Sequence, residues 1–339
     1  MSHVPFTLRR RLIAAFAQGA LALTAAGWLA PTRAIAQDDK WPSRPVRMIV
    51  PFPAGSFTDT VARVLSEHIG RSMGQPVVVE NKAGANGVIG VSEAARSAPD
   101  GYTLLVTNSS SITINPQIYK KVPYRASDFM PVTMVLEAPF ILVANPDWAQ
   151  KNNIRSVKDL VQFAGQHPGK LSYGSAGPGN IAHLSLAMLS NREGVKMTHI
   201  PYKSAAAAQM ALLSGELDAL FDTWTALPHI KAGKLKPLAV TSSKRMAQLP
   251  EVPTMEQSGI ADFVVTFWIG MLVPAGTPPQ VVQKLNTLAQ ELRDDAKAKA
   301  VLAAQGDVVL LDPASFAKRI DQEVPTWGAV IQREAVKLD

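Results

Sequence analysis

The chain has 339 residues and no cysteine, which excludes disulfide bonds, thiolate metal sites and a lipidated N-terminal cysteine. Hydrophobic residues make up 47% and charged residues 18%, as in a globular protein, and this excludes a disordered chain. The formal charge of +7 falls to +7 − 4 = +3 without Arg9, Arg10, Arg11 and Arg33, so we expect no nucleic-acid partner. The length predicts two domains, each with its own core.

The first 36 residues have the three parts of an export signal. Arginines 9–11 precede an uncharged apolar run, and Ala34-Ile35-Ala36 follows as a small-x-small cleavage site. We expect cleavage after Ala36 and a soluble, exported chain that begins at Gln37. The alternative is an uncleaved anchor, because about 20 apolar residues can span a bilayer; the many alanines and the cleavage site argue against it. The consecutive arginines are compatible both with a general secretory signal and with a twin-arginine signal.

Strand-like and helix-like segments alternate along the rest of the chain. Short apolar runs predict strands at 46–52, 77–80, 102–107, 140–145, 171–174, 198–202, 217–221, 235–240, 263–274 and 308–311. Helical periodicity predicts helices after an N-cap at Thr58, at 89–98, 157–164, 181–189, 205–213, 279–293 and 296–305, and from about Pro313. The alternation predicts an α/β fold with mostly parallel strands flanked by helices.

No linker rich in proline, glycine or serine divides the mature chain. The chain is therefore expected to cross between two domains inside structured segments, at 140–145 and 263–274. One domain would then be discontinuous, 37–138 plus 267–339, and the other would be the insert 139–266. Because ligands of open α/β sheets bind at the carboxyl ends of strands, two facing domains would form a cleft that closes by a hinge motion.

Two turns between a strand and a helix are candidate anion sites. The first is the segment 51–59, which contains Ala54, Gly55, Ser56, Phe57, Thr58 and Asp59. Unpaired N–H groups at the start of a helix attract anions, and Gly55 allows close approach of the backbone. The lysine of a phosphate loop and the three spaced glycines of a dinucleotide site are missing, which leaves a carboxylate-sized anion. The alternative is a plain turn capped by Thr58.

The second turn, 174–180, contains Ser175, Ala176, Gly177 and Asn180 and also lies between a strand and a helix. Two such turns, one in each expected domain, could hold the two ends of a small acid across the cleft. Asn108 and the serines that follow it add neutral donors at another strand end, and Tyr202-Lys203-Ser204 does so after the strand at 198–202.

Catalytic interpretations are weaker. His183 and His199 lack metal-ligand spacing, and each fits a hydrogen-bonded structural histidine better. Asp222 follows a strand and is either a base or a helix cap. No G-x-S-x-G motif predicts a serine hydrolase, and Ser175 lies in GSAG instead.

Motifs in a fixed order over essentially the whole mature chain carry a family resemblance. They are WPSRPVRMIVPFPAGSFTD, GQPVVVENKAGANGVIG, APDGYTLLV, INPQIYKKVPY, LSYGSAGPGNIAHL, HIPYK, LKPLAVTSSKR, LPEVPTMEQSG, FWIGMLVPAGTP and EVPTWGAVI. In these the chain resembles the substrate-binding proteins of tripartite tricarboxylate transporters, the Bug or TctC-like family.

The resemblance implies a two-domain Venus-flytrap fold, type II-like, that binds a small carboxylate in the periplasm and passes it to membrane permease subunits. It implies a monomer without enzymatic activity, cofactor or metal. The family's ligand loops correspond to 53–59 and 175–183, which includes His183, and further cleft positions correspond to Asn108, Tyr202 and Asp222. In the family, backbone amides and bridging waters hold the carboxylate at these loops.

The chain departs from the family pattern at four positions, and these bear on the ligand more than on the fold. Ser56 stands in place of the second glycine of a Gly-Gly pair, and Phe57 where a small or polar residue is usual. Ser204 and Ala207 replace a glycine and a proline. Phe57 either packs under the loop or lines the cleft and covers an apolar or aromatic ligand.

Two other functions stay open on the sequence alone. A ligand-dependent partner of a sensor protein would use the same closed form. An exported hydrolase would need a serine or aspartate beside a base, for which the sequence has only scattered candidates. The sequence does not tell an aromatic carboxylate from a dicarboxylate, because backbone amides recognise the carboxylate and not the rest of the molecule.

Overall fold

The computed structural model describes residues 41–333. The expected signal peptide, its cleavage after Ala36 and the mature N-terminus at Gln37 lie outside the described residues. None of the helices within 41–333 combines the length and the apolar character needed to cross a bilayer.

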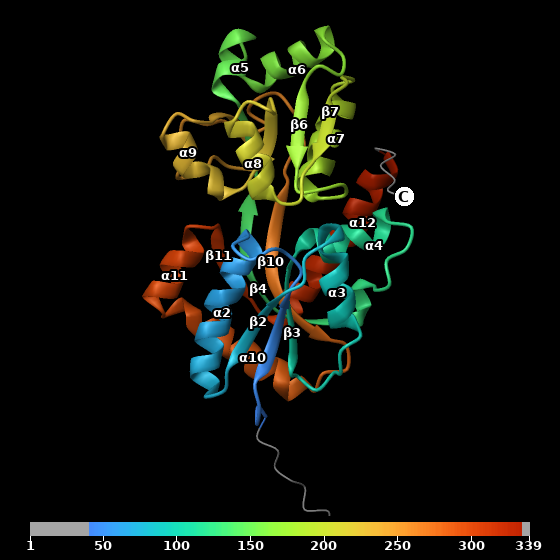
Figure 1. The fold of residues 1–339 in the computed structure, drawn as a ribbon, viewed down its shortest axis with the longest axis vertical. Coiled ribbons are helices and arrows are strands. Elements are labelled where there is room, and N and C mark those ends of the chain that lie inside the picture. Colours follow the sequence, from blue (N-terminus) through green and yellow to red (C-terminus); the bar gives the residue numbers. More distant parts are fainter. Residues whose placement is uncertain (1–40, 334–339) are drawn as a thin grey trace, which may run out of the picture. The chain divides into compact units, whose positions relative to one another are not determined.

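Six strands form the first sheet, in the order β11-β4-β10-β3-β1-β2 (Figure 1). Strands β1 to β4 run in one direction, and β10 and β11 run in the other. The core of this sheet includes the fully buried Trp268 and Phe316, whose rings pack edge to face 4.8 Å apart. The strands are β1 (Val46–Val50), β2 (Val77–Asn81), β3 (Thr103–Asn108), β4 (Phe129–Pro139), β10 (Thr266–Pro274) and β11 (Asp307–Leu311).

Five strands form the second sheet, in the order β7-β6-β8-β5-β9. All of them except β5 run in the same direction. The strands are β5 (Ile141–Ala144), β6 (Ser172–Ser175), β7 (Thr198–Pro201), β8 (Ala219–Asp222) and β9 (Lys236–Val240). Both sheets are therefore mostly parallel in strand direction, as the alternation of strands and helices predicts.

Helices connect the strands of both sheets. Helix α2 packs on β2 and on α10, and α12 packs on β4, while α7 and α8 pack on β8 of the second sheet. The helices are α2 (Phe57–Met73), α3 (Val88–Ala95), α4 (Asn115–Ile118), α5 (Pro146–Lys151), α6 (Val157–Gln166), α7 (Ile181–Arg192), α8 (Ala205–Leu213), α9 (Leu227–Lys231), α10 (Pro279–Gln290), α11 (Ala296–Ala303) and α12 (Pro313–Arg333).

The chain passes between the sheets twice, and the two passages lie side by side. β4 ends at Pro139, β5 begins at Ile141, and Pro139 pairs with Thr266 at the start of β10 (Figure 1). The buried Thr241 hydroxyl accepts a hydrogen bond from Phe140 N at 2.8 Å and donates one to the carbonyl of Val265 at 2.5 Å. One side chain thus joins both passages.

The strand β4, the longest of the first sheet, was not predicted from the sequence. Its sequence, FMPVTMVLEAP, contains two prolines, a threonine and a glutamate, which interrupt the apolar run. The strand forms because β10 pairs with it from Phe129 to Pro139 and β11 pairs with it at residues 134–137. The passage itself agrees with the expected crossing near Phe140, and the division into domains stays a prediction.

Candidate ligand-binding site

A cavity of about 490 Å³ lies between strand ends of the two sheets. Of the residues proposed from sequence, those that line it are Ser56, Phe57, Thr58, Asn108, Ser175, Ala176, Gly177, Asn180, Tyr202 and Asp222. Ala54, Gly55, Asp59 and His183 are not part of the lining. The topology explains the grouping, because the ends of β1 and β3 and those of β6, β7 and β8 face the same space.

The first turn is capped by Ser56 and not by Thr58, which corrects the sequence prediction. Ser56 is in an extended conformation, its hydroxyl accepts a hydrogen bond from Asp59 N at 3.2 Å, and α2 begins at Phe57. Thr58 is buried within the first turn of the helix. Gly55 has a φ of 76°, in the left-handed region, which explains the glycine before the cap.

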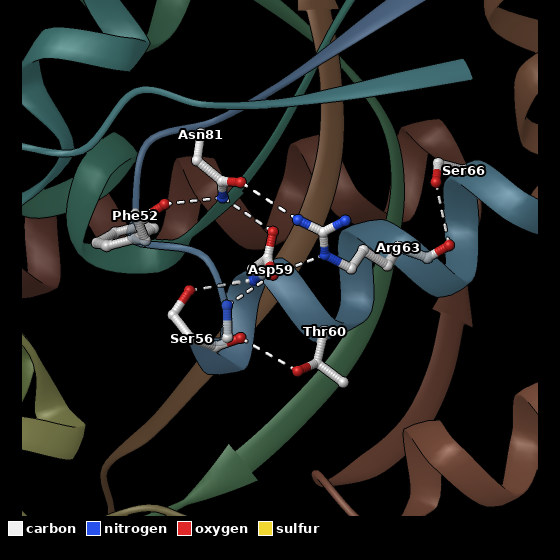
Figure 2. Close-up of polar contacts among 8 residues, drawn as sticks. Phe52, Ser56, Asp59, Thr60, Arg63, Ser66 and Asn81 are labelled. Carbon is white, nitrogen blue, oxygen red and sulfur yellow. Dashed lines mark hydrogen bonds and ion pairs between the residues drawn. The ribbon is translucent and has the colours of Figure 1, made fainter. Parts of the chain in front are cut away.

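The Asp59 carboxylate accepts several hydrogen bonds that stabilise this turn (Figure 2). Its carboxylate accepts hydrogen bonds from Gly55 N at 2.8 Å, Asn81 Nδ2 at 2.8 Å and Arg63 Nε at 2.8 Å. Asn81 also donates to the carbonyl of Phe52 at 3.0 Å, which connects the end of β2 to the turn. Burial raises the pKa of Asp59, but these hydrogen bonds outweigh burial and keep the pKa below its ordinary value.

The Asp59 carboxylate therefore already occupies part of the turn that was expected to bind the anionic ligand. The sequence reading treated all N–H groups here as available, yet Asp59 occupies that of Gly55. Within the described residues, the backbone N–H groups of Phe57 and Thr58 have no hydrogen-bond partner, and both residues line the cavity. These two groups, at the positive end of the α2 dipole, are the donors left for a carboxylate.

The second turn is largely satisfied by the protein itself, which also differs from the sequence expectation. Gly177 N donates to Ser175 Oγ at 3.2 Å, and Gly179 N donates to His183 Nδ1 at 3.2 Å. Ala182 N donates to the Asn180 side chain at 2.9 Å. Gly177, with a φ of 121°, allows the sharp reversal. The turn is preorganised, and among its cavity-lining residues Ala176 keeps a backbone N–H without a hydrogen-bond partner in the described part of the chain.

A stack of three rings supports the second turn. His183 and His199 lie 4.0 Å apart between ring centroids, and Tyr173 stacks on His199 at 5.0 Å. Burial lowers the pKa of His183 to about 4, and burial together with His183 lowers the pKa of His199 to about 3. Both imidazoles are neutral at pH 7, and this lets His183 Nδ1 accept the Gly179 hydrogen bond.

Ser175 Oγ lies 2.7 Å from His199 Nε2, the arrangement of a nucleophile and its base. Two observations argue against catalysis. Ser175 is 3% exposed and also hydrogen-bonds the carbonyl of Gly177 at 3.0 Å. A histidine whose pKa lies near 3 is a weak base at neutral pH. The pair acts as a support of the turn.

Asp222 is 2% exposed, and it accepts hydrogen bonds from Gln209 Nε2 at 2.7 Å and Thr223 N at 2.7 Å. Burial raises its pKa to about 6.

Two other polar residues of the lining are engaged within the protein. Asn108 accepts a hydrogen bond from Ser111 N at 3.4 Å through its side-chain oxygen, and the Tyr202 hydroxyl donates one to Glu216 at 2.8 Å. Asp222 and Lys203 are the charged side chains of the lining.

Sequence reasoning missed the contacts that join the two sides of the cavity, although it included Ser110 among the polar residues that follow Asn108. The Tyr119 hydroxyl donates to the carbonyl of Pro178 in the second turn at 2.8 Å. Ser110 Oγ accepts from Ile181 N, the first residue of α7, at 3.2 Å. Phe140 and Phe267, at the two passages between the sheets, also line the cavity. No local pattern marks the two hydrogen bonds, because their partners are 59 or more residues apart in sequence.

Two α/β sheets joined by paired passages, with a cavity between their strand ends, define the fold of periplasmic binding proteins. The model of the tripartite tricarboxylate transporter family receptor matches residues 61–336. BugT of Bordetella pertussis is 37% identical over 320 residues, covering 93% of this chain and 96% of the relative. The chain therefore belongs to the TctC family of periplasmic solute-binding proteins.

Solved structures agree with this assignment. The periplasmic binding protein BugD is 37% identical, with a TM-score of 0.80 over 88% of this chain and 99% of that one. MatC from Rhodopseudomonas palustris, solved with bound malate, is 30% identical, with a TM-score of 0.79 over 86% of this chain and 100% of that one. BugD is described as a periplasmic binding protein and the matching family as a receptor family, and the fold is the type II-like Venus flytrap.

Proposed function

We propose that the protein captures a small carboxylate in its cavity and delivers it to the membrane subunits of a tripartite tricarboxylate transporter. The observation that carries the proposal is the pair of backbone N–H groups at Phe57 and Thr58, which have no hydrogen-bond partner in the described residues and belong to cavity-lining residues at a helix N-terminus. Malate in MatC is a carboxylate bound by a protein of the same fold. Aromatic carboxylates and dicarboxylates are both within the proposed ligand class.

A thermal-shift screen with a panel of carboxylic acids tests this function. A ligand at 100 times its dissociation constant should add about 2.7 kcal/mol to the free energy of unfolding. The corresponding neutral amides should add nothing, because they lack the charge that the α2 N-terminus attracts. A panel in which no acid raises the melting temperature would contradict carboxylate capture.

We further propose that residues 37–138 with 267–339 form one domain, that 139–266 form the other, and that ligand closes them. The hydrogen bonds Tyr119–Pro178 and Ser110–Ile181 join these proposed domains on the cavity side and support closure. The closed form is the one that a permease, or alternatively a sensor protein, would recognise. The closed form makes contacts with the ligand that the open form lacks, so the ligand shifts the population toward the closed form.

Tyr119→Phe is expected to weaken the binding of every ligand by about two- to tenfold, because the variant loses one neutral hydrogen bond of the closed form only. Calorimetric titration measures the affinity, and small-angle scattering should show less compaction at saturating ligand than in the wild type. Tyr102→Phe is the matched control, since its hydroxyl contacts Ser43. Wild-type affinity in Tyr119→Phe would show that the contact plays no part in closure.

We also propose that the chain is exported and cleaved after Ala36, on the strength of the Ala34-Ile35-Ala36 sequence. The intact mass of protein recovered from the periplasm should correspond to a chain that begins at Gln37. A mass that includes residues 1–36 would rule cleavage out.

A further inference from the structure

Four phenylalanine rings form a continuous row along the cavity wall. Phe57 meets Phe267 edge to face with centroids 5.4 Å apart, Phe267 meets Phe140 at 4.9 Å, and Phe140 meets Phe221 at 6.4 Å. All four residues line the cavity. We call this set (Phe57, Phe140, Phe221 and Phe267) the phenylalanine row.

The row is assembled from segments that are distant in sequence. Phe57 opens α2 and Phe267 lies in β10, while Phe221 lies in β8 of the other sheet. Phe140 lies between β4 and β5, at the passage from one sheet to the other. The row therefore spans both sides of the cavity at the paired passages.

Phe57 differs from the other three rings in its burial. Phe140, Phe221 and Phe267 are 4%, 3% and 5% exposed, so their remaining surface is small. Phe57 is only half-buried: one edge packs on Phe267, and the ring also borders the cavity. A half-buried aromatic residue beside open N–H donors gives a site with one polar end and one apolar wall, the usual composition of a small-molecule pocket.

We propose that the phenylalanine row contacts the body of the ligand, so that the site selects carboxylates with an aromatic ring over hydroxylated aliphatic acids. This inference rests on the proposed carboxylate capture and specifies its ligand class. The carboxylate lies at the N–H groups of Phe57 and Thr58, and the ring lies against Phe57. The charges of the lining fit this class: Lys203 is exposed, and Asp222 is a buried acid that repels a second carboxylate beside it.

Calorimetric titration with benzoate, propionate and malate tests the inference. Benzoate should bind more tightly than malate. Phe57→Ala should weaken benzoate binding by about three- to tenfold, because an aromatic contact adds that much beyond the area it buries. Propionate, which is too short to reach far along the row, should change by less than about twofold. Phe57→Leu keeps an apolar side chain against Phe267 and should show an intermediate loss for benzoate.

Phe163→Ala is the matched control, because Phe163 is also half-buried and packs on Trp148 in α5, outside the cavity lining. Melting temperatures of all variants show whether they are folded. Tighter binding of malate than of benzoate, or equal losses for benzoate and propionate in Phe57→Ala, would overturn the aromatic selectivity while leaving carboxylate capture intact. If none of the three acids binds, carboxylate capture fails and the selectivity fails with it.

Discussion

Replacing Asp59 with alanine is expected to lower the free energy of unfolding by about 2–4 kcal/mol, because it removes a buried charge with three donors and leaves those donors unpaired. Asp59 is 1% exposed, whereas its ion-pair partner Arg63 is 56% exposed, so most of the loss comes from the amide and Asn81 hydrogen bonds. Ligand affinity should fall at least about tenfold, because the turn that carries the Phe57 and Thr58 N–H groups loses its anchor. Urea unfolding and calorimetric titration measure the two effects.

The chain contains a matched control for this experiment. Asp159 occupies the same position in α6 as Asp59 does in α2: its N–H donates to the cap Ser156 at 3.2 Å, and it accepts from Arg155 N at 2.9 Å. It is less buried and lies outside the cavity lining. Asp159→Ala should cost about 1 kcal/mol, the usual effect at a helix N-terminus, and leave affinity unchanged. Equal effects of the two substitutions would mean that Asp59 is only a capping residue.

Stability is expected to fall steeply as the pH drops from about 6.5 toward 3, because His183 and His199 are buried in neutral form. Their folded-state pKa values, about 4 and about 3, lie below the ordinary value of 6.5. In the folded state the two histidines bind protons less readily than in the unfolded state. Their contribution to the free energy of unfolding is therefore complete above pH 6.5, and it is lost as the pH falls from 6.5 toward the folded-state pKa values. At 1.36 kcal/mol per unit, His183 alone contributes about 3 kcal/mol, and the stacked pair titrates jointly.

Asp222 opposes this trend in part. Burial raises its pKa to about 6, so its ionised form destabilises the folded state, and this penalty is relieved as the pH falls below 6. The histidine contribution is isolated by comparing wild type with His199→Gln in urea unfolding from pH 7.5 to 4. The variant should show a shallower decline, and His167→Gln, at an exposed position, controls for the loss of a histidine. A variant as steep as wild type would refute the assignment.

Ligand affinity is also expected to decrease as the pH falls from about 6.5 toward 3. Protonation of His183 at Nδ1 turns the acceptor of the Gly179 hydrogen bond into a donor, so the second turn loses its shape. Binding is thus expected to weaken over the range in which stability falls.

Much of the local structure followed from the sequence. The helix at 205–213 agrees with α8, and β9 at Lys236–Val240 lies within the predicted strand. The turns after β1 and β6 were located because capping residues and glycines mark them. The missed β4 shows the limit, since a strand with two prolines and polar residues forms only because two neighbouring strands pair with it.

The sequence by itself determined the α/β class, the order of the elements and the turns that border the cavity, because periodicity and capping depend on neighbours in the chain. Only the tertiary structure decided which groups are available at those turns. Gly55 N is taken by Asp59, Ile181 N by Ser110, and the N–H groups of Phe57 and Thr58 stay open. The phenylalanine row is likewise tertiary, because packing across both sheets, and no local pattern, brings its four rings together.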